Sequence, residues 1–148
     1  MLLFLFEVKG LVKIDDYEVR EGLYYSKEWT WLKIEDGKVR IGITDYAQKQ
    51  LREVVFAELP EVGDEVVKGE PFGTVESVKS VSDLVAPISG KIVEVNEEAI
   101  DNPQIINEDP YGEGWLIVVS PSNLDEDLKT LMSFEESVEW HKELAKEG

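Results

Sequence analysis

"GTVESVKSVSDLVAPISGKIVEV", residues 73–95, is the stretch that decides the fold of this chain. Small and β-branched residues, which favour strands, stand on both sides of Lys79. The charged residues nearest to this lysine in the sequence are Glu76 and Asp83. The stretch therefore predicts a β-hairpin that presents Lys79 at its exposed tip.

The chain is strongly acidic. Its 148 residues include 32 Asp and Glu against 15 Lys and Arg, a formal charge of -17. This charge argues against binding to nucleic acid or to an anionic membrane, because both depend on basic side chains that neutralise phosphate. It suits docking on basic protein surfaces, where charge speeds encounter, and it equally suits simple solubility.

Reactive side chains are scarce. The sequence has no cysteine, and His141 is its single histidine. Disulfides, thiolate chemistry and multi-histidine metal sites are therefore excluded, and we expect no metal centre. Any redox or acyl chemistry has to come from a group that is added to the chain.

Short strands and turns fill most of the chain. Residues 29–44 alternate around Asp36-Gly37, a dipeptide that favours a tight hairpin turn. Asp45, with Gln48 three residues later, predicts the N-cap of a short helix. Further strands are expected where β-branched residues cluster, at 53–59, 91–96 and 115–120.

After residue 121 the sequence pattern changes from short strands to helices. Leucines recur at helical spacing, and Ser133 with Glu136 forms a capping box ahead of a terminal helix whose apolar face includes His141. We expect a mostly β, antiparallel fold with a short internal helix and C-terminal helices. We also expect a single domain over 1–148, with an N-terminal extension at 1–21 and a helical segment at 122–148.

The N-terminus, "MLLFLFEVKG", carries a short apolar run without a basic flank or a small-residue cleavage site. Such a run is too short for a signal peptide or a membrane span. We expect a strand or a packing arm here, and a cytoplasmic protein.

Lys79 can be interpreted in two ways from its surroundings. An exposed lysine is usually solvated and has no special role. However, the tip is not built from Asn-Gly or Gly-Gly, and the flanking acids Glu76 and Asp83 offer a setting that a modifying enzyme could recognise. These features alone do not decide between the two interpretations.

Three blocks of sequence resemble one known family. "VESVKSVSDLVAPISGKIVEVNE" is similar to the lipoate-attachment segment of the glycine cleavage system H protein family. "KEWTWLKIEDGKVRIGITDYAQKQLREVVFAELPEVGDEV" resembles the N-terminal half of that family, and "INEDPYGEGWLI" resembles its late signature. The blocks stand in the family's order and cover about residues 22 to 145. The resemblance implies a flattened barrel-sandwich hybrid of two small antiparallel sheets, as in lipoyl and biotinyl domains.

The resemblance also implies a function. The chain would be a carrier rather than an enzyme, with lipoate attached to Lys79 through an amide. Its partners would be a pyridoxal-phosphate glycine decarboxylase, a tetrahydrofolate-dependent aminomethyltransferase, dihydrolipoyl dehydrogenase and a lipoate-attaching enzyme. The arm would accept the aminomethyl group from the first, pass it to the second and be reoxidised by the third.

Matching motif to motif carries over three groove residues. Ser26, Glu28 and Asp83 would line the groove in which the loaded arm rests, and Glu76 with Asp83 would be recognised by the modifying enzyme. The family commonly has His between the serine and the glutamate, whereas this chain has Lys27. A cation at that position could compete with the ammonium of the loaded arm or point to solvent.

Three other functions fit the same sequence. One is a lipoyl carrier of the same fold in another pathway, such as sulfur metabolism or a lipoate relay. A biotin carrier is less favoured, because that family usually frames its lysine with methionines, whereas Val78 and Ser80 flank Lys79. The last is an interaction module whose lysine stays unmodified.

Overall fold

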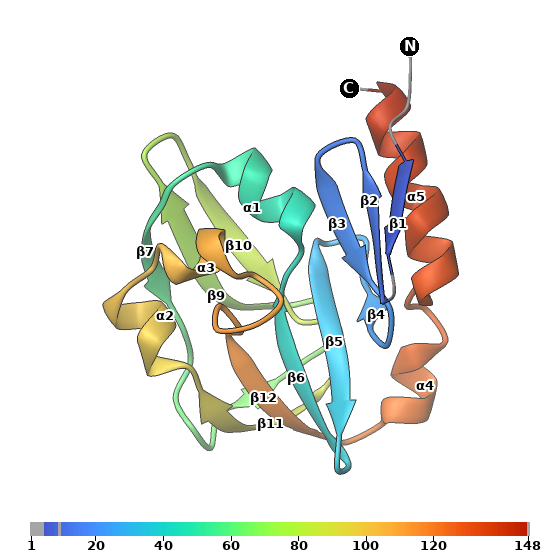
Figure 1. Ribbon diagram of the computed structural model, residues 1–148. Coiled ribbons are helices and arrows are strands. Elements are labelled where there is room, and N and C mark those ends of the chain that lie inside the picture. The colour runs from blue at the N-terminus through green and yellow to red at the C-terminus, as the bar shows by residue number, and fades with distance from the viewer. Residues whose placement is uncertain (1–4, 9, 148) are drawn as a thin grey trace.

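Three antiparallel sheets make up the β part of the computed structural model, which describes residues 5–8 and 10–147 (Figure 1). The strands are β1 (Leu5–Val8), β2 (Leu11–Ile14), β3 (Tyr17–Arg20), β4 (Tyr24–Tyr25), β5 (Thr30–Glu35), β6 (Lys38–Ile43), β7 (Val54–Glu58), β8 (Glu65–Val66), β9 (Pro71–Ser77), β10 (Val81–Val85), β11 (Gly90–Val95) and β12 (Ile117–Pro121). The helices are α1 (Asp45–Leu51), α2 (Glu97–Asp101), α3 (Ile105–Glu108), α4 (Leu124–Leu128) and α5 (Phe134–Glu147).

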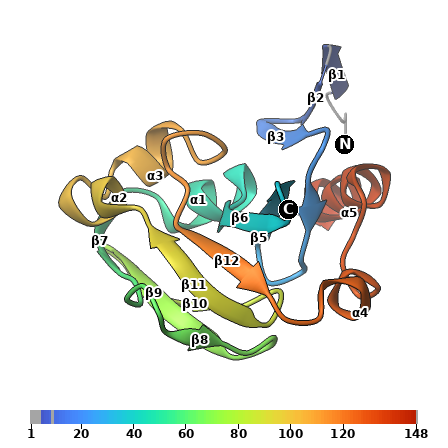
Figure 2. The same cartoon turned by 90° about the horizontal axis from the view of Figure 1, so that it is seen from below.

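Two of the sheets enclose the main hydrophobic core. The larger has the strand order β4-β5-β6-β12-β11-β8, and the smaller has the order β10-β9-β7. Buried side chains from both, such as Leu32 and Ile41 on one and Val75 and Leu84 on the other, belong to one cluster. Figure 2 shows the two sheets as layers. The expected class, a mostly β flattened barrel-sandwich, is confirmed, and the barrel is not closed.

A third sheet, β1-β2-β3, was not expected from the sequence. Val12 pairs with Val19 across β2 and β3, and both are buried with Ile14 in a second cluster that includes Ala145 of α5. Of the two possibilities that we expected for the N-terminus, a strand or a packing arm, the structure shows a strand, β1, although residues 1–4 of the apolar run lie outside the described residues. The N-terminal sheet is therefore stabilised by the C-terminal helix (Figure 1).

Helix α1 begins one residue earlier than we expected. Thr44 is the N-cap, and its hydroxyl accepts a hydrogen bond from the Ala47 amide at 3.1 Å. The prediction that Asp45 caps the helix is wrong. The Asp45 carboxylate instead accepts hydrogen bonds from the Glu18 amide at 2.9 Å and from the Gln48 side chain at 2.8 Å. Asp45 thus joins α1 to β3, and the adjacent hydroxyl is left to cap the helix.

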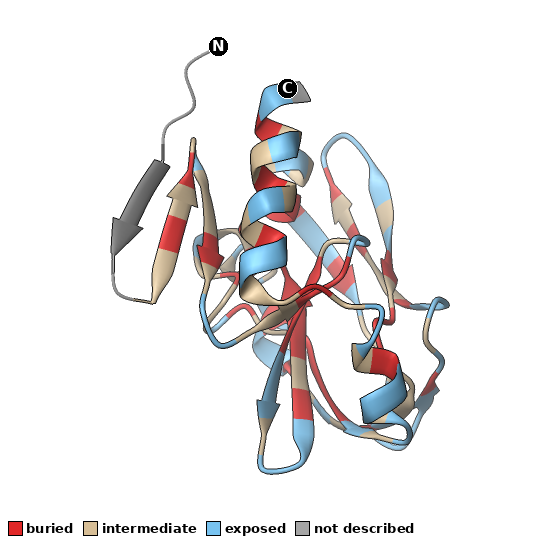
Figure 3. Cartoon of the chain, turned by 90° about the vertical axis from the view of Figure 1, so that its right-hand side faces the viewer, coloured by how far each residue is buried: buried red, intermediate tan, exposed pale blue. Residues whose placement is uncertain are grey.

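Local sequence signals set several other elements. Asp36 and Gly37 adopt φ of 51° and 77°, as a two-residue hairpin turn between β5 and β6 requires. Ser133 and Glu136 form the predicted capping box, with bonds of 3.1 and 3.3 Å. Figure 3 shows both buried and exposed residues along α5. His141 of this helix is fully buried. No helix in the described part of the chain is long and apolar enough to cross a membrane.

Candidate functional site

Lys79 lies in the turn between β9 and β10, as the sequence predicts. The buried side chain of Ser77 organises this turn. Its hydroxyl accepts hydrogen bonds from the amides of Lys79 and Ser80, each at 3.2 Å, and the Ser77 amide donates to the Ser80 carbonyl at 2.8 Å. One small hydroxyl residue therefore fixes the three-residue tip from inside, which leaves the lysine side chain free.

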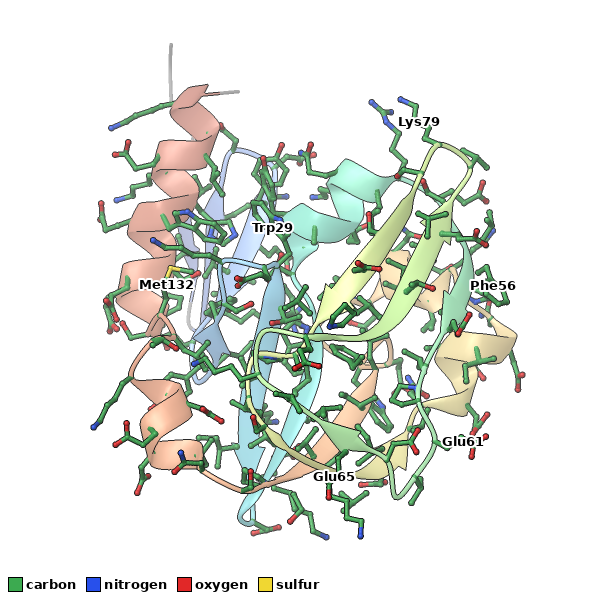
Figure 4. The ribbon with its side chains drawn as sticks, turned by 180° about the vertical axis from the view of Figure 1, so that it is seen from behind. Trp29, Phe56, Glu61, Glu65, Lys79 and Met132 are labelled. Carbon is green, nitrogen blue, oxygen red and sulfur yellow. The ribbon has the colours of Figure 1, made fainter. Side chains whose placement is uncertain are left out.

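The lysine itself faces solvent. Lys79 and its neighbours Val78 and Ser80 are exposed, and Figure 4 labels the lysine at the outer end of the hairpin. No ion pair or side-chain hydrogen bond found in the described residues involves its ammonium group. An amine in this position is accessible to a second protein and can carry a long substituent without disturbing the core.

A groove begins beside the tip. It encloses about 340 Å³ between β10 and α1, within the range of small-molecule sites. Its apolar wall includes side chains from the smaller sheet, from α1 and from the loop before β5, namely Val75, Leu84, Tyr46, Leu51 and Trp29. Ser80, next to Lys79, also lines the groove, as do the carboxylate residues Glu28 and Asp83. The groove is thus mostly apolar with two acids at its border.

The structure separates the predicted groove residues. Glu28 and Asp83 line the same groove, but Ser26 is buried and lines a neighbouring cavity of about 300 Å³ together with Lys27 and Glu28. The Ser26 hydroxyl lies 2.6 Å from the Thr30 hydroxyl and accepts a hydrogen bond from the Thr30 amide at 3.2 Å. Ser26 therefore shapes the 26–30 loop that carries Glu28.

Glu76 lies away from the groove. It is next to the buried residues Val75 and Ser77 on β9, and alternation along the strand places its side chain on the opposite face of the sheet. Glu76 and Asp83, the two acids predicted for enzyme recognition, lie on the two strands that flank the tip. Through its register with Thr74, Asp83 shares the face of Glu76, but it is exposed on the edge strand β10 and therefore also borders the groove.

Trp29 is a site residue that no motif in the sequence singled out. Its φ of 76° is unusual for a bulky residue. The conformation is held by hydrogen bonds from its amide to Ser26 and from the Thr44 amide to its carbonyl. The indole of Trp29 lines the groove and stacks between two other rings. Its ring centroid lies 4.7 Å from that of Tyr46 and 4.9 Å from that of Trp140 on α5.

His141 stands behind this aromatic wall. The ring makes edge contacts with Tyr46 and Trp140, and its Nδ1 lies 2.8 Å from the Ser137 carbonyl. Burial lowers the pKa of His141, and the Ser137 hydrogen bond opposes this only in part. The neutral ring donates from Nδ1, so it packs as part of the core rather than as an acid–base group, in agreement with the expected packing role.

Facing antiparallel sheets, with one protruding lysine on a short hairpin, define a carrier domain of the lipoyl or biotinyl type. A family model described as glycine cleavage H-protein matches residues 23–144. The chain belongs to the glycine cleavage H-protein family. It is a lipoyl carrier protein and not a catalytic enzyme, since that is what the family contains.

Individual relatives agree with this assignment. A probable glycine cleavage system H protein of Pyrococcus abyssi is 53% identical over 135 residues, which are 90% of this chain and 100% of the relative. The glycine cleavage system H protein of Halalkalibacterium halodurans is 60% identical over 114 residues, 77% of this chain and 88% of the relative. The crystal structure of the Mycobacterium marinum H protein matches with a TM-score of 0.76 and 43% identity, over 83% of this chain and 98% of that one.

Proposed function

We propose that the chain carries lipoate on Lys79 and shuttles the aminomethyl group of glycine. It would receive the group at glycine decarboxylase, deliver it to the tetrahydrofolate-dependent aminomethyltransferase, and be reoxidised by dihydrolipoyl dehydrogenase. Lipoate supplies the redox-active sulfur that a chain without cysteine lacks. We also propose that residues 1–148 act as one carrier domain, located in the cytoplasm.

The exposed amine of Lys79 is the observation that carries the proposal. The amine is presented by a turn that Ser77 holds from inside, so modification costs no buried contact. Amide formation removes the positive charge, and no carboxylate within the described residues loses an ion pair with Lys79 as a result.

The groove offers a resting place for the loaded arm. Its apolar wall would exclude water from the carried group, which would slow hydrolysis. Glu28 and Asp83 would accept hydrogen bonds from the protonated amine of that group. Ser26 would act indirectly, by holding the loop that positions Glu28 and Trp29.

The charge of the chain suits a carrier that visits several enzymes. A net charge of -17 speeds encounter with basic docking surfaces without requiring tight complexes. Rapid release matters because each enzyme must give way to the next. We therefore expect the decarboxylase, the aminomethyltransferase, the dehydrogenase and the lipoate-attaching enzyme to present basic surfaces to this chain, and we expect no nucleic-acid or membrane partner.

Replacing the lysine tests the proposal. Lys79→Arg keeps the charge but removes the acylatable amine, so we expect no lipoyl mass increment in intact-mass spectrometry and no glycine–bicarbonate exchange with purified decarboxylase. Because the residue is exposed, thermal unfolding should be unchanged. Lys91→Arg, an exposed lysine on β11, is the matched control and should retain both activities.

The outcomes separate the competing functions. Exchange that survives in Lys79→Arg would show that the carried group is not attached there. A biotin-sized increment, or a wild-type chain that stays unmodified beside active lipoylation enzymes, would favour the biotin carrier or the plain interaction module. Lipoylation without exchange would point to a lipoyl carrier of another pathway.

A further inference from the structure

Apolar side chains are exposed around the lysine hairpin in a way that the carrier role alone does not require. Seven large hydrophobic residues are exposed among those described, and four of them lie on β7 or at the β9–β10 hairpin, namely Val55, Phe56, Val78 and Val81. Single exposed apolar residues are normal, but a group on one sheet indicates an interaction surface.

Cross-strand register places two of them in one row. Phe56 pairs with Glu76, and Glu76 pairs with Val81, so the three side chains cross the smaller sheet side by side on its outer face. Phe56 is 47% exposed and Val81 is 62% exposed. This row ends two residues from Lys79, and Figure 4 shows Phe56 and the lysine on the same sheet.

The next row adds acidic groups. Glu58 pairs with Thr74, and Thr74 pairs with Asp83, two residues further along each strand on the same face. We call the two rows together the outer face, which consists of Phe56, Glu58, Thr74, Glu76, Val81 and Asp83. Its apolar side chains are thus accompanied by three carboxylates.

We propose that the outer face is the docking surface for the enzyme that attaches lipoate to Lys79, an inference that rests on the proposed function. That enzyme brings an activated lipoyl adenylate to the lysine. The deprotonated Nζ attacks its carbonyl, an amide bond forms and AMP leaves. The enzyme must therefore cover the hairpin tip and one face of its sheet.

The core leaves the outer face as the accessible one. The inner face holds the buried residues Val54, Ala57, Val75 and Leu84, which belong to the main core. On the outer face a partner can bury Phe56 of the edge strand β7 as an aromatic anchor, the residue class that dominates interface energetics. The chemistry of the partner follows, since it needs an apolar pocket for Phe56 bordered by Lys or Arg side chains that match Glu58, Glu76 and Asp83.

The kinetics of lipoylation test the docking surface. With a purified lipoate ligase, ATP and lipoate, we expect Phe56→Ser to lower kcat/KM for modification about tenfold, as loss of an interface anchor does. Val62→Ser removes an apolar residue outside the sheet that is even more exposed, at 64%, and should leave kcat/KM unchanged. Val81→Ser tests a second residue of the same cross-strand row and should also lower kcat/KM. Circular dichroism checks that each variant folds.

Charge reversal tests the partner's chemistry. Glu58→Lys should reduce the rate at low salt, and rising ionic strength should shrink the difference from wild type, because exposed charges are screened. Glu94→Lys, on β11 in the other sheet, is the control for net charge. An identical loss in both variants would mean that only the total charge matters, which would overturn the acidic part of the surface.

The remaining outcomes distinguish this inference from the proposed function. If wild type is lipoylated at Lys79 and Phe56→Ser is modified at the wild-type rate, the docking surface is wrong while the carrier role stands. If Phe56→Ser is lipoylated normally but accepts the aminomethyl group poorly, the face serves the decarboxylase instead, and the inference is again overturned. If wild type is not lipoylated at all, both proposals fail.

Discussion

Two hairpins of this chain differ in how far their side chains are buried. The β2–β3 hairpin buries Val12, Ile14 and Val19 against α5, whereas the β9–β10 hairpin exposes Val78, Lys79 and Ser80 at its tip. Among the described residues, the side chain that hydrogen-bonds the β9–β10 turn is Ser77 of the hairpin itself. The comparison indicates that the reactive residue stands where packing is least, so that modification and docking do not cost stability.

Side-chain hydrogen bonds to the backbone of β3 help to fix the β2–β3 hairpin. The Tyr111 hydroxyl donates to the Glu18 carbonyl at 2.7 Å, and Asp45 accepts from the Glu18 amide. Tyr25 exchanges two hydrogen bonds with the backbone of Arg20, at 2.7 and 2.8 Å. Because β3 is an edge strand, its unpaired backbone groups need such partners, and buried side chains supply them.

The sharpest test of the comparison makes the same substitution in both hairpins. Val19→Ala should lower the free energy of unfolding by about 2 kcal/mol, because a fully buried valine loses its methyl groups and leaves a cavity. Val78→Ala, at a residue that is 72% exposed, should change it by less than about 0.5 kcal/mol. Chemical denaturation at constant m-value measures both. Equal losses would mean that the lysine hairpin is as tightly packed as the N-terminal one.

Much of the lysine hairpin could be predicted from the sequence because its determinants are local. β-branched arms define β9 and β10, and Asp36-Gly37 defines the neighbouring hairpin in the same way. The groove depended on contacts that are distant in sequence. Trp29, which lines the groove, stacks on Trp140 of α5, and no local pattern signals that pairing. A positive φ at a tryptophan gives no sequence signal either.

The N-terminal sheet could not be predicted for the same reason. Its strands are short, and they are stabilised by side chains such as Tyr111 and Ala145 from the other end of the chain. The misplaced N-cap has a related cause. Thr44 and Asp45 are both good caps by residue type, and the choice depended on whether the Asp45 carboxylate was engaged by Glu18.

Lowering the pH should destabilise the fold through His141, which is buried in the packed part of the molecule. Because burial lowers the pKa of His141, the unfolded chain binds a proton below about pH 6.5 while the folded chain still resists it. The free energy of unfolding should therefore fall as pH decreases below 6.5, by at most about 1.4 kcal/mol per pH unit, and be unaffected by this group above it.

His141→Phe is the matched variant for that titration, since it keeps an aromatic ring among Tyr25, Tyr46 and Trp140 without a titratable nitrogen. The slope between pH 7.5 and 5.5 should flatten in this variant. Asp45, the nearby carboxylate whose charge favours the protonated ring, stays in place in both proteins. An unchanged slope would assign the pH dependence to the carboxylates instead of to His141.

The smallest expected effect lies on the lysine side, at Glu28. Glu28→Gln should shorten the lifetime of the aminomethyl-loaded arm by at most about fivefold, because exposed ion pairs are worth about 0.2–1 kcal/mol. Lipoylation and unfolding should stay unchanged, since Glu28 is exposed and lies outside the outer face. Ammonia release from the loaded, isolated carrier measures the lifetime, with Glu94→Gln as the control. If the two variants hydrolyse alike, Glu28 makes no contact with the carried amine, and the protection comes from the apolar wall around Trp29 alone.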